Sequence, residues 1–197
     1  MKAPAKISII IAVVFLLLAA ALSLVARNQA LSLVYHPLHE RNLLSKTPAD
    51  FSLQYRDVSV QSTDGNTIHA WYIPSENGAG IILQHGFKSD REELLEEAAI
   101  LANKGYGVLV SSIRAHDVNE GELIAFGLKE MPDLDAWVNF LQEQEGIASI
   151  GMLGNSLGAS LIIQYAAANE DIKAVVAHSA FSSMRDTINT SVIYFTD

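Results

Sequence analysis

The chain has 197 residues, of which 50% are apolar and 18% are charged, and it contains no cysteine. This length suits one domain with a small appendage, and this composition excludes a disordered or collagen-like chain. Without cysteine the chain can build no disulfide, no thiolate zinc site and no cysteine nucleophile. Residues 28–197 carry 10 basic and 22 acidic side chains, and this net charge of −12 makes nucleic acid a poor partner.

A run without any charged side chain, residues 7–26, lies near the N-terminus. A helix of about 20 residues is about 30 Å long, which matches the hydrocarbon core of a bilayer. We therefore expect residues 1–27 to be a single-pass anchor in the cell membrane, with a cleaved signal peptide as the alternative. Lys2 and Lys6 precede the run and Arg27 follows it, so the positive-inside rule predicts a cytoplasmic N-terminus and an extracytoplasmic domain.

A linker and a hairpin are expected after the apolar run. Residues 28–50 contain two prolines and several polar residues, which favour a linker that lies against the domain. Two β-prone runs, residues 53–60 and 67–73, then flank the dipeptide Asp64-Gly65. This dipeptide is a strong signal for a tight turn, so we expect an antiparallel hairpin at the start of the domain.

Strands and helices are predicted to alternate along the rest of the chain. Short apolar runs between turn residues predict strands, and apolar residues at three- and four-residue spacing predict helices. The expected strands are residues 80–84, 108–113, 147–153 and 172–178, and the expected helices are residues 89–105, 128–144 and 157–168. The first helix is expected to begin with a capping box of Ser89 and Glu92. This order predicts an α/β domain over residues 51–197, with a mostly parallel sheet and helices on both faces.

The sequence Gly154-Asn155-Ser156-Leu157-Gly158 lies between an expected strand and an expected helix. In that context it predicts a nucleophile elbow, a sharp turn that strains the serine backbone and exposes the hydroxyl at the C-terminal edge of the sheet. The glycines two places on either side leave room for the chain to approach itself. We therefore predict Ser156 to be a catalytic nucleophile. A strand–helix turn of small residues without chemistry is the alternative.

A serine nucleophile needs N–H donors for the negative charge that develops on the carbonyl oxygen. The first predicted donor is the backbone N–H of Leu157, at the positive end of a helix dipole. The second is the backbone N–H of Phe87, in the loop after the third strand, where Gly86 is expected to let the loop bend. His85 in the same loop is expected to be a structural residue that bonds to nearby backbone.

These features resemble the α/β-hydrolase superfamily, and more narrowly its membrane-anchored serine hydrolases, from about residue 35 to the end of the chain. The matching segments are Tyr35-His36-Pro37, Asp64-Gly65, Trp71-Tyr72-Ile73-Pro74, His85-Gly86-Phe87, Arg114-Ala115-His116 through Glu120-Gly121, residues 154–158 and residues 178–183. The resemblance implies the α/β-hydrolase fold and supports the role of Ser156. Ser112, Asp117 and Asn119 stand where the family usually has Asp, Gly and Ser, and we expect this difference to loosen their loop.

The acid and the base of a serine triad are not evident in this chain. The order in this fold is Ser, acid, His, and the only histidine after Ser156 is His178, at the end of the last expected strand. Glu170 and Asp171 precede that strand and are expected about 20 Å away, at its other end. His178 is therefore a weak candidate for the base, since nothing is expected to fix its tautomer. The resemblance implies that acid and base lie on two further strands, so we expect the chain to be the N-terminal part of a longer protein.

The predicted function is that of a serine hydrolase that cleaves an ester, thioester or amide bond through an acyl-enzyme on Ser156. The substrate is expected to be a small-molecule or peptide acyl compound, and no metal ion or other cofactor is indicated. The alternative is a non-catalytic, membrane-tethered binding protein, because acid and base are not found; upstream, His116 and Asp117 are interpreted as a loop pair. Without its base, the 197-residue chain by itself is expected to be inactive.

Overall fold

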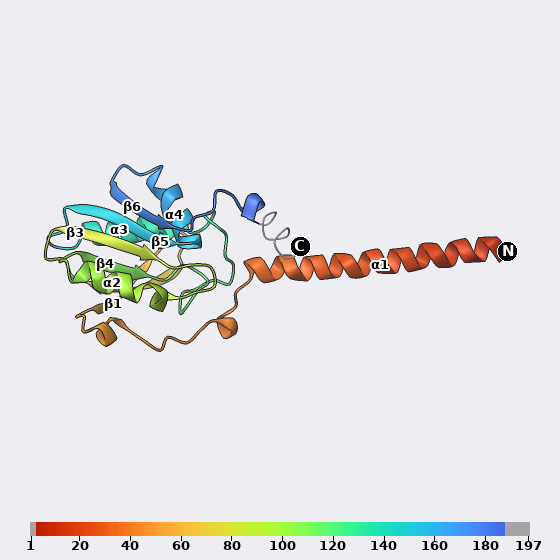
Figure 1. Cartoon of the computed structure of the whole chain (residues 1–197), viewed down its shortest axis with the longest axis horizontal. Coiled ribbons are helices and arrows are strands. Elements are labelled where there is room, and N and C mark those ends of the chain that lie inside the picture. Colours follow the sequence, from red (N-terminus) through yellow and green to blue (C-terminus); the bar gives the residue numbers. More distant parts are fainter. Residues whose placement is uncertain (1–2, 188–197) are drawn as a thin grey trace. The chain divides into compact units, whose positions relative to one another are not determined.

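The computed structural model describes residues 3–187, with side chains from Lys6 onward (Figure 1). Residues 188–197, the end of the predicted domain, lie outside the described part. The chain forms two compact units, which adjoin in sequence at Tyr35 and His36. The second unit therefore begins at His36, ahead of the expected domain boundary at residue 51.

The first unit is the helix α1 (Ala3–Val34). It continues past Arg27, so residues 28–34, which the sequence predicts to be linker, are helical. The reason is that this stretch contains the strong helix formers Gln29, Ala30, Leu31 and Leu33, and the next proline is Pro37. From Lys6 to Val34 the helix is long and apolar enough to cross a membrane, a property that a signal sequence shares.

The second unit is built on a six-stranded sheet with the strand order β1-β2-β4-β3-β5-β6. Its strands are β1 (Arg56–Gln61), β2 (Thr67–Ile73), β3 (Ala79–Gln84), β4 (Gly107–Ser111), β5 (Ser149–Asn155) and β6 (Ile172–His178). β1 and β2 form the expected antiparallel hairpin, β2 pairs antiparallel with β4, and all other neighbours are parallel. The predicted, mostly parallel sheet is therefore confirmed.

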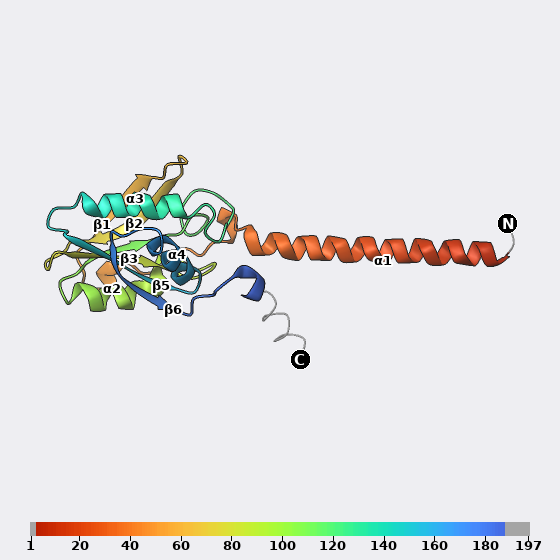
Figure 2. The same cartoon turned by 90° about the horizontal axis from the view of Figure 1, so that it is seen from above.

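Helices cover both faces of this sheet, as predicted. They are α2 (Leu95–Ala102), α3 (Met131–Gln142) and α4 (Leu157–Ala166). Figure 2 shows α2 and α3 on opposite sides of the strands. Because side chains alternate along a strand, Tyr72 of β2 joins one buried cluster with Trp137 of α3, while the adjacent Trp71 joins the other cluster with Leu95 of α2. The core thus consists of two apolar layers, one on each side of the sheet.

The helix expected from Ser89 begins later and with a different cap. A 3₁₀ turn, η3 (Arg91–Leu94), precedes α2, and its N-cap is Asp90, whose carboxylate accepts a hydrogen bond from the N–H of Glu92 at 2.9 Å. The predicted capping box of Ser89 and Glu92 is therefore wrong. The Glu92 side chain bonds elsewhere and accepts from the N–H of Lys46 at 2.9 Å.

Residues 36–50 lie against the sheet and belong to the second unit. The N–H of His36 donates to the carbonyl of Glu122 at 2.7 Å. The guanidinium of Arg41 donates to the carbonyls of His36 and Asn119, at 2.9 and 2.6 Å. These bonds attach the segment to the loop that follows β4.

β6 is an outer strand of the sheet. It pairs with β5 on one side, and within residues 3–187 no strand pairs with its other side. Its side chains from residue 173 onward are exposed, and Val176 is 59% exposed. β6 is therefore the least buried strand next to the serine turn.

Candidate active site

Ser156 forms the turn between β5 and α4. Its backbone has φ 50° and ψ −109°, a conformation that a residue with a side chain adopts only under strain. Its N–H donates to the carbonyl of His178 at 2.8 Å, and its carbonyl accepts from the N–H of Ser160 at 3.1 Å, so both sides of the turn are held. Although Ser156 is the N-cap residue of α4, its side chain does not cap the helix, and within residues 3–187 its hydroxyl has no hydrogen-bond partner. The hydroxyl is therefore free for a ligand.

The two glycines of the turn lie where no side chain fits. A Cβ on Gly154 would lie 2.6 Å from the backbone of Gly158, and one on Gly158 would lie 2.1 Å from the carbonyl oxygen of Gln84. Both contacts are with backbone atoms, which cannot move without displacing α4 or β3. The start of α4 therefore packs directly on the end of β3 and brings the loop after β3 next to Ser156.

Gly86 makes the contact between that loop and the serine turn. A Cβ on Gly86 would lie 3.6 Å from the Cβ of Ser156, and the carbonyl of His85 accepts from the N–H of Gly158 at 3.1 Å. The residue of this loop with a positive φ is Lys88, at 53°, and Gly86 is not among the glycines with a positive φ. Gly86 instead permits the close approach of the loop to the serine.

Phe87 and Leu157, whose N–H groups are the predicted donors, each adjoin one side of this contact in the sequence. Phe87 follows Gly86, and Leu157 is the first residue of α4, where backbone N–H groups lack a partner within the helix. Within residues 3–187 neither N–H donates to a protein acceptor. Two N–H groups without a protein acceptor thus belong to residues next to the contact between the loop and the serine turn.

His85 is a structural residue of the loop, as expected. Its ring is fully buried, with Nδ1 bonded to the carbonyl of Gly86 at 2.8 Å and Nε2 accepting from the N–H of Ile113 at 3.1 Å. Because both ring nitrogens are occupied, His85 is neutral and cannot serve as a base. Burial lowers the pKa of His85, in agreement with this state.

His116 holds the same loop from its other side. Its buried ring bonds through Nδ1 to the carbonyl of Arg114 at 2.9 Å and accepts at Nε2 from the N–H of Lys88 at 2.9 Å. Burial, together with the neighbouring His85, lowers the pKa of His116 to about 2. The ring is therefore neutral near pH 7 and fixes the position of Lys88.

The loop after β4 is tightly bonded. The Asp117 carboxylate lies 2.5 Å from Nε of Arg91, and His116 bonds to backbone on both sides of its ring, so both residues hold the loop together. Asn119 donates from its side chain to the carbonyl of Ser112 at 2.7 Å. The expectation that Ser112, Asp117 and Asn119 loosen this loop is wrong, because these residues supply hydrogen bonds and an ion pair that hold it.

His178, the weak candidate for the base, has a partner, but that partner is not the serine. Its Nδ1 lies 3.0 Å from Oδ1 of Asn155, which fixes the ring, contrary to the expectation that nothing would. Among the described residues no hydrogen bond joins His178 to the Ser156 hydroxyl. Asp171 lies at the other end of β6, as expected, and accepts from Gln142 at 3.2 Å. The structure therefore brings the loop after β3 against the Ser156 turn, and within residues 3–187 no base bonds to the Ser156 hydroxyl.

Glu93 belongs to the site although the sequence gives no sign of it. Its half-buried carboxylate accepts from the N–H of Gly86 at 2.8 Å through Oε2, and from the Asn155 side chain through Oε1. In the sequence Glu93 is one of several similar acids, at positions 92, 93, 96 and 97. Only the fold of the loop after β3 distinguishes it from the others.

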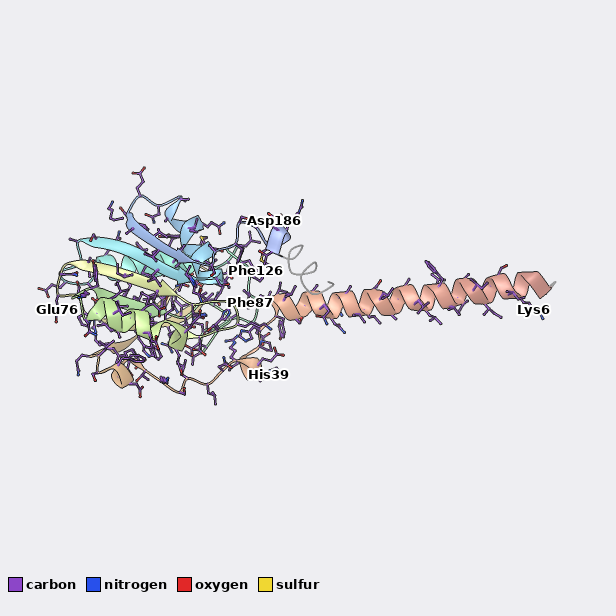
Figure 3. All side chains as sticks on the ribbon, viewed as in Figure 1. Lys6, His39, Glu76, Phe87, Phe126 and Asp186 are labelled. Atoms are coloured by element: carbon purple, nitrogen blue, oxygen red, sulfur yellow. The ribbon has the colours of Figure 1, made fainter. Side chains whose placement is uncertain are left out.

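A cavity of about 560 Å³ lies next to the serine turn, between α4 and the segment after β6. Its lining residues are Phe126, Ser160, Ile163, Gln164, Ala180, Phe181, Ser182, Ser183 and Met184. The ring of Phe126 stacks on that of Phe87 at 5.7 Å, and Figure 3 shows both residues at the same end of the unit. Ser160 joins the cavity to the turn, because its hydroxyl donates to the carbonyl of Ser156 at 3.2 Å. Among the residues described, no cluster of acidic or histidine side chains is arranged to hold a metal ion.

Residues 81–195 match the protein family described as alpha/beta hydrolase fold. The chain belongs to this family. The matched segment of this alpha/beta hydrolase runs from β3 through the serine turn and β6, so it contains the loop after β3, the turn and the cavity.

Similar proteins include one solved esterase and several curated sequences. The alpha/beta hydrolase is similar to the esterase Pf2001 of Pyrococcus furiosus, with a TM-score of 0.75 and 30% identity over 83% of this chain and 62% of that chain. It is 30% identical over 136 residues to the uncharacterized protein Rv2307c of Mycobacterium tuberculosis, a match that covers 66% of this chain and 47% of that protein. It is 29% identical over 147 residues to the alpha/beta hydrolase domain-containing protein WAV2 of Arabidopsis thaliana, covering 71% and 47%. The chain spans about half the length of the curated relatives it matches.

Proposed function

We propose that the complete gene product containing these residues is a serine hydrolase, in which Ser156 attacks the carbonyl carbon of an ester, thioester or amide. The observation that carries this proposal is the strained turn at Ser156, whose unbonded hydroxyl lies beside two unbonded N–H groups. Membership of the alpha/beta hydrolase fold family and the similarity to an esterase support a hydrolytic activity.

In the proposed reaction, the Ser156 hydroxyl gives its proton to a general base while its oxygen bonds to the carbonyl carbon. The carbonyl oxygen becomes an oxyanion and accepts hydrogen bonds from the N–H groups of Phe87 and Leu157, where the dipole of α4 adds to the stabilisation. The tetrahedral intermediate then expels the leaving group, which takes the proton, and an acyl group remains on Ser156. Water attacks this acyl-enzyme by the same route and releases the acid and the free serine. The base is not assigned to any of residues 3–187.

The cavity beside Phe126 supports an apolar acyl group as the part of the substrate that is bound. Its volume of about 560 Å³ is in the range of small-molecule pockets, about 300–1,000 Å³. Phe126, Ile163, Phe181 and Met184 supply apolar walls, and the nearby Ser160 hydroxyl is already bonded to backbone. We therefore propose esters, thioesters or amides of apolar carboxylic acids as the substrate class.

Hydrolysis of p-nitrophenyl esters by the complete gene product tests the role of the serine. Ser156→Ala should lower kcat by at least about 10⁴-fold, because the residual rate comes from binding and the oxyanion donors alone. Ser59→Ala is the matched control, since Ser59 is an exposed serine of β1, an outer strand on the far side of the sheet from β6. Equal rates in the Ser156→Ala variant and the wild type would remove the basis of the proposal.

A non-catalytic binding protein is the second candidate function. The observation that favours it is that no base contacts the Ser156 hydroxyl within residues 3–187. In that case the N–H groups of Phe87 and Leu157 would hold a carbonyl or carboxylate oxygen of a ligand without chemistry. A complete gene product that binds an apolar carboxylic acid, yet gives no ester hydrolysis above the Ser156→Ala background, would favour this function over the first.

We also propose that α1 is retained as an anchor in the cell membrane, with the hydrolase unit outside the cytoplasm. The length and apolarity of Lys6–Val34 and the lysines at its start support this topology. An epitope placed at the N-terminus should remain on the mature protein and sediment with membranes after carbonate washing. A soluble mature protein without the epitope would identify a cleaved signal peptide, and a C-terminal reporter active only in the cytoplasm would reverse the orientation.

A further inference from the structure

One carboxylate holds both loops that carry the candidate oxyanion donors. Glu93 Oε2 accepts from the N–H of Gly86 at 2.8 Å, and Glu93 Oε1 accepts from the side-chain amide of Asn155. Phe87 is the residue after Gly86, and Leu157 lies two residues after Asn155. A single side chain therefore joins the two segments on which the candidate donors lie.

The approach of the three elements leaves little space around this carboxylate. A Cβ on Gly86 would lie 3.2 Å from one oxygen of Glu93 and 3.3 Å from the other, and 3.6 Å from the Cβ of Ser156. The carboxylate, the loop after β3 and the serine turn thus meet at one point. A change in length or hydrogen bonding at Glu93 must shift the loop relative to the turn.

The charge of Glu93 is compensated by the bonds it accepts. Burial raises the pKa of Glu93, but hydrogen bonds from the Ser89 side chain, the Gly86 N–H and the Asn155 side chain outweigh it and leave the pKa below its ordinary value. The carboxylate is therefore ionised near neutral pH, and hydrogen bonds to an ionised acceptor are about twice as strong as neutral ones.

The ionised carboxylate also orients Asn155. A carboxylate only accepts hydrogen bonds, so Asn155 must turn its NH₂ group toward Glu93 and its oxygen toward His178. That oxygen lies 3.0 Å from Nδ1 of His178, which must then carry the proton. The chain of bonds runs from the loop after β3, through Glu93 and Asn155, to the end of β6.

We propose that Glu93 is a positioning residue of this site, which sets the distance between the N–H donors of Phe87 and Leu157 by binding Gly86 and Asn155 at once. This inference rests on the proposed serine hydrolase function, because its consequence is a change in transition-state stabilisation. Oxyanion donors act only when they are held in place before the reaction, and a displacement of about 1 Å can cost about 100-fold in rate.

The donor and acceptor of the hydrogen bond between Asn155 and Glu93 can be exchanged by substitutions that keep the lengths of both side chains. In Glu93→Gln, the new amide can still accept from Gly86, but its NH₂ group then faces the NH₂ group of Asn155. In Asn155→Asp, two carboxylates face each other. In the double variant, the glutamine at position 93 accepts from Gly86 and donates to the aspartate at position 155, whose other oxygen still faces His178.

The test is steady-state ester hydrolysis by the complete gene product, purified in detergent. Each single variant should lower kcat by about 10- to 100-fold with KM changed less than threefold, and the double variant should recover most of the loss. Glu97→Gln is the matched control: Glu97 of α2 lines the same small pocket as Glu93, which is separate from the cavity beside Phe126, and no bond to its side chain is found within residues 3–187. It should keep the wild-type kcat.

Hydrogen–deuterium exchange gives a readout that does not depend on activity. The amides of residues 86–88 should exchange faster in each single variant and return to the wild-type rate in the double variant. Single variants with wild-type kcat, or losses that add up in the double variant, would overturn the role of Glu93. If Ser156→Ala keeps full activity, the proposed function itself fails, whereas an inactive Ser156→Ala beside a fully active Glu93→Gln refutes only this inference.

Discussion

The two sides of Ser156 differ in how deeply their residues are buried and in how many bonds hold them. On the side of β3 and β4, the loops are buried and cross-linked by both ring nitrogens of His85 and by the ion pair of Arg91 and Asp117. On the side of β6 the chain is exposed, and the His178 ring has one bond, to Asn155.

This difference separates two parts of the proposed chemistry. Stabilising an oxyanion needs dipoles that are fixed before the reaction, and the bonds of His85, of Gly86 and of Lys88 hold the loop that carries the proposed donor Phe87. Removing the serine proton needs a base within about 3 Å of the hydroxyl, and none is found within residues 3–187. The described residues thus include the proposed donors for charge stabilisation and leave the proposed proton transfer without a partner.

High activity of the 197-residue chain by itself would contradict most strongly the inferred difference between the two sides of Ser156. We expect the Ser156-dependent rate of ester hydrolysis to exceed the rate in water by at most about 10³- to 10⁴-fold, because only the oxyanion donors and substrate binding contribute when the base is missing. Turnover in the usual enzyme range of about 1–1000 per second, lost in His178→Gln, would make His178 the base and contradict this account. The assay needs the chain in detergent, with Ser156→Ala as the background.

Removal of one oxyanion donor should have the next largest effect. Phe87→Pro deletes the N–H group, and in the complete gene product it should lower kcat by about 100- to 1,000-fold. Phe87→Leu keeps the N–H and loses the ring, which stacks on Phe126 and lies under the Lys88 ammonium, so it should stay within about tenfold of the wild type. Equal losses in the two variants would assign the effect to the side chain and not to the donor.

Low pH should reduce the stability of the fold on the side of β3 and β4, because His85 and His116 are buried there in their neutral form. The pKa values of His85 and His116 are lowered in the folded chain, so the unfolded chain binds these protons first as the pH falls. Their contribution to the free energy of unfolding is complete above pH 6.5 and is lost below it, by up to about 1.4 kcal/mol per pH unit for each ring.

Urea unfolding between pH 7.5 and 5 measures this loss. His116→Gln should unfold more easily at pH 7.5 but show a shallower decline with pH than the wild type. His39→Gln is the control, because His39 is exposed, and it should leave the slope unchanged. A wild-type slope in the His116→Gln variant would show that this ring does not couple protonation to folding.

The smallest expected effect concerns the cavity between α4 and the segment after β6. Phe126→Ala enlarges it and should shift the preferred acyl chain of p-nitrophenyl esters to a longer one, with about a tenfold change in the ratio of kcat/KM values. Leu128→Ala is the matched control, since Leu128 is 88% exposed and does not line the cavity. An unchanged chain-length profile in Phe126→Ala would place the acyl group elsewhere.

Local sequence signals sufficed for the elements and for the serine turn. The dipeptide Asp64-Gly65 marks the hairpin because Gly65 has a φ of 90°, and the pattern of residues 154–158 marks the turn because a Cβ on Gly154 or Gly158 would meet backbone atoms. The start of the first helix was harder, because Ser89 and Asp90 are both good caps and only the path of the preceding loop decides between them.

Contacts between distant segments could not be predicted. Glu93 is indistinguishable from its acidic neighbours until the fold brings it to Gly86 and Asn155. In the same way, Asp117 follows His116 directly in the sequence, but its carboxylate pairs with Arg91 across the structure. Sequence spacing constrains neighbours on one element, whereas these bonds join loops that follow different strands.

The most direct test of the central claim is to map where an active-site reagent reacts. The complete gene product is incubated with a fluorophosphonate, digested, and analysed by peptide mass spectrometry. This account predicts one adduct, on Ser156, and none after Ser156→Ala. An adduct on another residue such as Ser160, or ester hydrolysis that persists when Ser156 is fully modified, would contradict it.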